Sequence, residues 1–169
     1  VPFFSSTFRS YFILAQVEYT IGPADTYNIP LVRAQEGGFP PSDFSALRVR
    51  AGSPPHEIIL CDALTDEQFL NHLLEAIARG LSVRGANGQI QAVATAALKS
   101  LWQPSQGRLI PSVMNAEQSN SSVVYEKRVV LKMFRRLEQG LNSDLEISAF
   151  LTGNTSFRNV PPLAGYVEY

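Results

Sequence analysis

The feature that most constrains this chain is an alternation of apolar side chains near its N-terminus. Apolar residues occupy every second position from 11 to 19, and the alternation resumes from 27 to 31. A period of two places these side chains on one face of a strand, and the segment 21–25, with Gly22 and Pro23, has the composition of a turn. The sequence therefore predicts an antiparallel β-hairpin.

Two shorter strands are expected after this hairpin. The segment 37–42 contains two glycines and two prolines, which cannot sustain a strand or a helix interior, so it predicts a loop. The short segment 47–49 and the apolar run 58–61 predict two strands, and the Gly- and Pro-containing segment 52–55 separates them.

The clearest helix signal spans residues 66–78. Thr65 followed by Gln68 has the pattern of a capping box with Thr65 as the N-cap, and apolar residues recur at helical spacing from Phe69 to Ile77. Gly80 supplies a C-terminal stop. A strand-rich segment with one packed helix predicts a small α+β subdomain with an antiparallel sheet over residues 1–85.

Residues 86–169 predict a second unit, which again combines an antiparallel sheet with a helix. A strand to about Val93 and a helix from Thr95 come first. Runs at 109–116, 122–125 and 129–134 then predict three successive strands joined by short connections, which is a meander. The segment 160–169 predicts one further strand.

A helix is expected between the meander and this last strand. Asn142 or Ser143 can cap it, and its first turn carries Asp144 and Glu146, which suit the positive end of a helix dipole. Its apolar stripe consists of Ile147, Phe150 and Leu151. We expect this helix to pack over the meander.

Composition places the chain among ordinary globular proteins. It has 169 residues, of which 45% are hydrophobic and 17% charged, and its net charge is -1. No dense basic run occurs outside 132–136, and this shortage of positive charge disfavours nucleic acid or an anionic membrane as a partner. The single Cys61 excludes an internal disulfide, and no apolar run is long enough to span a membrane, so we expect a reduced, cytoplasmic protein with Cys61 as an inert core thiol.

Lys132 and Glu146 are the residues with the clearest chemical potential. Lys132 lies on the third strand of the predicted meander, and Glu146 lies fourteen residues later in the first turn of the next helix. Protein-kinase-like small lobes use such a lysine on nucleotide phosphates and orient it with a helix glutamate. The alternatives are a solubilising charge at a sheet edge for Lys132 and a helix-dipole contact for Glu146.

Several segments of the second half resemble the maltokinase family, a group that also occurs fused to the C-terminus of trehalose synthases. They are Ala116–Tyr125, Arg128–Glu138, Asn142–Ile147 and Val160–Gly165. The resemblance is strong over 115–169 and weaker over 11–34 and 60–74. It implies an N-terminal cap followed by the small lobe of an aminoglycoside-phosphotransferase-like kinase, which transfers the γ-phosphoryl of ATP to maltose with Mg²⁺.

The resemblance also implies a set of nucleotide-binding residues. Lys132 falls on the family's phosphate-contacting lysine, and Glu146 falls on its helix partner. The loop over the phosphates corresponds to Gln118, Ser119, Asn120, Ser121 and Ser122. Because this loop lacks glycine, its binding of phosphate would depend on backbone N–H groups and on the Ser and Asn side chains. Ser121 stands where the family usually has threonine. The alternative is an ordinary hairpin loop. Arg135 and Arg136 are interpreted as a solvated basic end.

The catalytic machinery of a kinase is not evident in the sequence. Neither His56 nor His72 begins a His-x-Asp segment, and no metal-binding cluster is recognisable. Because the chain starts at Val1 without a signal-peptide pattern, we expect a fragment that supplies the cap and part of the ATP site, with no catalytic or metal residue of its own and no activity without the large lobe. The alternatives are a non-catalytic accessory domain of a trehalose synthase fusion and an unrelated α+β interaction domain.

Overall fold

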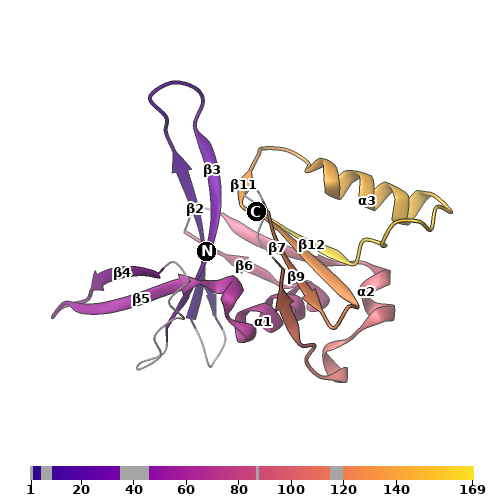
Figure 1. The fold of residues 1–169 in the computed structure, drawn as a ribbon, viewed down its shortest axis with the longest axis horizontal. Coiled ribbons are helices and arrows are strands. Elements are labelled where there is room, and N and C mark those ends of the chain that lie inside the picture. Colours follow the sequence, from indigo (N-terminus) through magenta and orange to yellow (C-terminus); the bar gives the residue numbers. More distant parts are fainter. Residues whose placement is uncertain (1, 5–8, 35–45, 87, 115–119) are drawn as a thin grey trace.

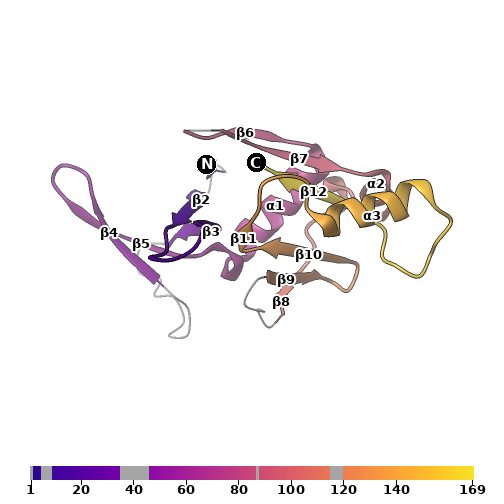
Figure 2. The ribbon, with the colours of Figure 1, turned by 90° about the horizontal axis from the view of Figure 1, so that it is seen from above.

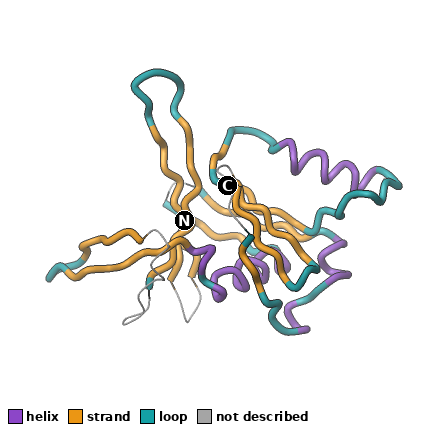
Figure 3. The backbone as a smooth tube through the Cα atoms, viewed as in Figure 1, coloured by secondary structure: helices purple, strands orange, loops and turns teal. Residues whose placement is uncertain are grey.

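The computed structural model describes residues 2–4, 9–34, 46–86, 88–114 and 120–169. It confirms the predicted α+β class, with antiparallel sheets and three α-helices (Figures 1 and 3). Along the chain the elements are β1 (Pro2–Phe4), β2 (Arg9–Val17), β3 (Asp25–Arg33), β4 (Ala46–Ala51), β5 (His56–Asp62), the 3-10 helix η1 (Ala63–Thr65), α1 (Glu67–Arg79), β6 (Ser82–Arg84), β7 (Gln89–Ala94), α2 (Ala96–Leu101), the 3-10 helix η2 (Pro104–Gln106), β8 (Pro111–Val113), β9 (Asn120–Tyr125), β10 (Val129–Phe134), β11 (Arg136–Leu137), α3 (Ser143–Asn154) and β12 (Gly165–Glu168).

The predicted N-terminal hairpin is confirmed as β2 and β3, which pair with Ile13 opposite Ile29. The short strands β4 and β5 form a second hairpin, and the sheet has the order β1-β2-β3-β5-β4. The small strand β11, from the second half of the chain, pairs with β3 through Arg136 and Tyr27. This N-terminal sheet is therefore extended by a strand that follows the meander in sequence.

Helix α1 begins one residue later than the capping box predicted. The N-cap is Asp66, whose carboxylate accepts a hydrogen bond of 2.8 Å from the amide of Phe69. The prediction of Thr65 was wrong because Thr65 ends η1 and its hydroxyl donates to the carbonyl of Asp62. Gly80 is confirmed as the stop, with the left-handed conformation φ 63° and ψ 43° that glycine adopts at little cost.

The meander is confirmed as the antiparallel sheet β10-β9-β8. The helix expected from Thr95 is also confirmed as α2, and Thr95 is its N-cap. The last strand differs from the prediction in length and in pairing. It spans only Gly165–Glu168 and pairs with β7, in a sheet of order β12-β7-β6. Pro161 and Pro162 lack the N–H groups that a longer strand would need for its ladder.

Helix α3 has the predicted cap but does not pack as predicted. Asn142 accepts hydrogen bonds from the amides of Asp144 and Leu145. Ile147 and Phe150 are each 58% exposed, and the helix has no buried residue. The expected packing over the meander was wrong because apolar residues are distributed around the helix instead of forming one stripe, and α3 lies beside the sheets (Figure 1).

The hydrophobic core is centred on α1. This helix lies between the β7-containing sheet and the meander (Figure 2). Phe69 is fully buried and its ring centroid lies 5.6 Å from that of Phe12, while Val123 and Tyr125 of β9 are also fully buried. The core thus draws on both sides of the predicted boundary at 85/86, and β6 and β7 pair across it; the division into two domains stays a prediction.

Among the described residues, no helix has both the length and the apolar character of a membrane-spanning helix.

Candidate functional site

The two faces of the meander differ in chemistry, and Lys132 lies on the face that is not buried against the core. On β9, Val123 and Tyr125 are buried against the core, whereas Ser122 and Val124 are half-buried on the opposite face. On β10, Met133 is buried on the core side, while Lys132 lies on the outer face of the sheet, the same face as Ser122. The registry of the strands puts Lys132 directly opposite Ser122. A cation and a hydroxyl therefore share the outer face of this sheet.

Lys132 is held by two neighbours. Its ammonium forms an ion pair and hydrogen bond with the carboxylate of Asp144 in the first turn of α3, and it lies 5.0 Å from the centroid of the Phe134 ring. The Lys132 side chain nevertheless keeps 46% of its surface exposed. The ammonium is thus oriented but accessible to an anion from solvent.

The acid beside Lys132 is not the one that the sequence indicated. Glu146 lies in the same first turn as Asp144, but residues two positions apart project from different faces of a helix. The structure therefore joins Lys132 to α3 as predicted, through Asp144 instead of Glu146. Both acids lie in the first turn of α3, so the spacing of the sequence alone does not distinguish them.

The predicted loop residues are distributed over different environments. Gln118 and Ser119 lie outside the described residues. Asn120 opens β9 opposite Phe134. Ser121 is 3% exposed and faces the inner side, so its hydroxyl does not join Lys132. Ser122 is the described loop residue that lies beside Lys132 across the strand pair.

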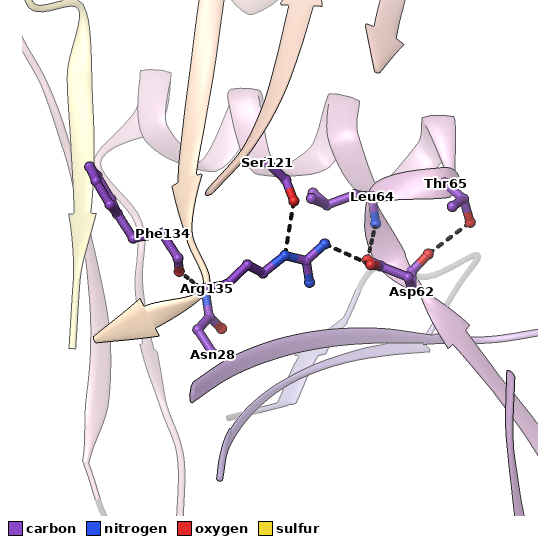
Figure 4. Close-up of polar contacts among 7 residues, drawn as sticks. All are labelled: Asn28, Asp62, Leu64, Thr65, Ser121, Phe134 and Arg135. Atoms are coloured by element: carbon purple, nitrogen blue, oxygen red, sulfur yellow. Dashed lines mark hydrogen bonds and ion pairs between the residues drawn. The ribbon is translucent and has the colours of Figure 1, made fainter. Parts of the chain in front are cut away.

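A polar cluster that the sequence did not predict connects the meander to the N-terminal sheet (Figure 4). Arg135 donates from Nε to the hydroxyl of Ser121 at 3.0 Å and from Nη2 to the carboxylate of Asp62 at 2.6 Å. The other oxygen of that carboxylate accepts the amide of Leu64. The side chain of Arg135 is only 22% exposed, so its interpretation as a solvated end was wrong. No local pattern marks this pair, because Arg135 and Asp62 are 73 residues apart.

The neighbouring Arg136 is more exposed. Its Nη2 lies 2.8 Å from a carboxylate oxygen of Asp25, and 52% of its side chain is exposed. Arg136 thus has the surface character that the sequence predicted, with an ion pair in addition.

An apolar surface adjoins Lys132 on the outer face of the meander. Val124 and Val130 face each other across β9 and β10, and Val130 is 64% exposed. This pair lies two positions from Ser122 and Lys132 along the strands, a separation of about 7 Å at the usual rise per residue. The outer face therefore offers, side by side, an apolar surface formed by two valines and a cation with a hydroxyl.

The single cysteine and the single tryptophan of the chain both lie in the core. Cys61 is buried, and burial raises the pKa of its thiol, which agrees with an inert core cysteine. Trp102 is 4% exposed and donates from Nε1 to the carbonyl of Gly107. Within the described ranges, no three His, Cys, Asp or Glu side chains are grouped as a metal site.

Comparison with models of known protein families found none that matches this chain. The geometry of the outer face of the meander is therefore the basis for a functional proposal.

Proposed function

We propose that this chain is the cap and small lobe of a maltokinase-like sugar kinase and that Lys132 binds the phosphates of ATP. The observation that carries the proposal is the ion pair between Lys132, on the third strand of a meander, and an acid in the first turn of the following helix. In protein-kinase-like small lobes this arrangement holds a lysine in place for nucleotide phosphates.

The state of Lys132 supports this role. A phosphate chain needs a cation that is fixed in position yet open to solvent, and Lys132 is anchored by Asp144 and Phe134 while about half of its side chain is exposed. Ser122, directly across the strand pair, offers a hydroxyl donor to a phosphate oxygen. The residues present thus fit the phosphate groups of a nucleotide.

The adjacent valines support a nucleotide over a simple phosphate. A purine ring is flat and apolar on its faces, and Val124 and Val130 form an apolar surface next to the cation. We infer that the base lies on this surface and that its phosphates extend toward Lys132.

The complete kinase would transfer the γ-phosphoryl of ATP to maltose. Bound Mg²⁺ supplies neutralisation of phosphate charge in such reactions. In this chain Lys132 and Ser122 would bind and orient the phosphates, while a large lobe is expected to orient the acceptor hydroxyl and to provide the ion's ligands. We therefore expect the isolated chain to bind nucleotide without transferring phosphate. A cytoplasmic location, and attachment to a trehalose synthase domain or subunit, belong to the same proposal.

The test is isothermal titration of the 169-residue chain with MgATP. Removing the Lys132 ammonium deletes one charge-assisted contact, so we expect Lys132→Ala to weaken ATP binding by about tenfold or more. Lys99→Ala is the matched control, because Lys99 is an exposed lysine on α2. Equal ATP affinity of Lys132→Ala and the unmodified chain would refute the proposal and favour a non-catalytic accessory domain.

A further inference from the structure

Arg135 connects parts of the chain that are far apart in sequence. Its guanidinium bridges Ser121 at the start of β9 and Asp62 at the end of β5, through two different nitrogens. Its backbone carbonyl accepts a hydrogen bond of 2.7 Å from the amide of Asn28 in β3. Arg135 thus fixes one end of the meander to the N-terminal sheet.

That end of the meander is the one that carries the proposed phosphate contacts. Ser121 precedes Ser122, and Arg135 follows Lys132 by three residues, so the bridge holds the two strands next to the Ser122–Lys132 pair. Asp62 is itself immobilised, because its second carboxylate oxygen accepts the amide of Leu64 and its carbonyl accepts the hydroxyl of Thr65. The bridge therefore ends on a rigid support.

We propose that Arg135 is a positioning residue for nucleotide binding, which aligns Ser122 and Lys132 by fixing β9 and β10 to Asp62. This inference rests on the proposed function. Arg135 faces the side of the meander opposite to Lys132, through the buried Ser121, and so acts on the phosphates through the strand positions alone. Loss of the bridge should therefore weaken the binding of the phosphates more than the binding of the base, because the Val124–Val130 surface lies farther from the bridge.

Two conservative substitutions distinguish the role of the hydrogen-bonded bridge from the role of the positive charge of Arg135. Arg135→Lys retains a cation for Asp62 but cannot bond Asp62 and Ser121 together, because an ammonium lacks the spaced donors of a guanidinium. Ser121→Ala removes only the hydroxyl. Arg136→Lys is the matched control, because Arg136 is adjacent, more exposed and paired with Asp25. Thermal unfolding of each variant identifies a temperature at which all are folded.

The experiment compares MgATP with adenosine as ligands of the full chain. We expect Arg135→Lys and Ser121→Ala each to weaken ATP binding by about fivefold to tenfold and adenosine binding by less than about twofold. We expect Arg136→Lys to change neither. Hydrogen exchange at the amides of 121–123 should become faster in both bridge variants, since the strand end loses its support.

The outcomes distinguish this inference from the proposed function. If Lys132→Ala loses ATP affinity while Arg135→Lys and Ser121→Ala keep it, the positioning role is wrong and the proposed function stands. If the bridge variants lose ATP and adenosine equally, Arg135 is only structural and the inference is wrong. If the unmodified chain binds ATP no better than adenosine, the proposed function fails and the positioning role fails with it.

Discussion

Tyr125 offers the sharpest test of how the meander is attached to the core. Its side chain is fully buried on β9, and its hydroxyl donates a hydrogen bond of 2.9 Å to the carbonyl of Leu70 in α1. Tyr125→Phe deletes this bond and leaves the ring in place. A buried hydrogen bond contributes about 0.5–1.5 kcal/mol net, so we expect the free energy of unfolding to fall by about 1 kcal/mol.

The same substitution has a pH signature. Burial raises the pKa of Tyr125 far above its ordinary value of about 10. Above about pH 10 the unfolded chain therefore releases this proton while the folded chain keeps it, and stability falls by about 1.4 kcal/mol per pH unit from this group. We expect the stability of the unmodified chain to decline more steeply above pH 10 than that of Tyr125→Phe, so the difference between them shrinks and then reverses.

The assay is urea unfolding followed by fluorescence at pH 7 and at steps above pH 10. Tyr169→Phe serves as the control at pH 7, because Tyr169 is 56% exposed and its substitution should change stability by less than about 0.5 kcal/mol. A Tyr125→Phe variant as stable as the unmodified chain at pH 7, with a parallel decline above pH 10, would refute the burial and the Leu70 contact together.

Two further predictions concern α3 and α1. Asp144→Asn should weaken the binding of MgATP by about fivefold in titration calorimetry, because Lys132 loses the partner that orients it. Glu146→Gln should leave the affinity within about twofold. A larger effect of Glu146→Gln than of Asp144→Asn would show that the pair seen in the structure is not the functional one. Gly80→Ala should lower the free energy of unfolding by about 1 kcal/mol in urea titration, because a φ of +63° disfavours a side chain. Steric contact is not the cause, since the added carbon would lie 3.7 Å from the Ala92 carbonyl oxygen. An unchanged midpoint of unfolding would contradict the left-handed C-cap.

Local signals in the sequence were sufficient for most elements. The alternation from 11 to 31 specified the β2–β3 hairpin, and the spacing of short apolar runs specified the meander. The cap of α1 was assigned one residue early because Thr65 and Asp66 are both good capping residues. The choice between them depends on η1, which uses the Thr65 hydroxyl for its own turn.

Tertiary placement was beyond local signals. The caps and composition of α3 predicted a helix but not where it lies, since its apolar residues do not define one face. The Arg135–Asp62 bridge depends on the meeting of segments 73 residues apart. The place of Lys132 on the third strand of the meander could be counted from the sequence, while its pairing with Asp144 instead of Glu146 depends on the orientation of α3.

The position of Lys132 is nonetheless a consequence of the core. A shift of β10 by one residue against its neighbours would turn Lys132 toward the core side that Met133 now occupies. Burying an unpaired ammonium there would cost several kcal/mol, and it would also expose Met133 and Val129. Tyr125 adds a directional bond to the same side through Leu70, which opposes any slip of β9. The inner face of the meander thus fixes its registry, and the registry in turn keeps Lys132 and Ser122 together on the outer face.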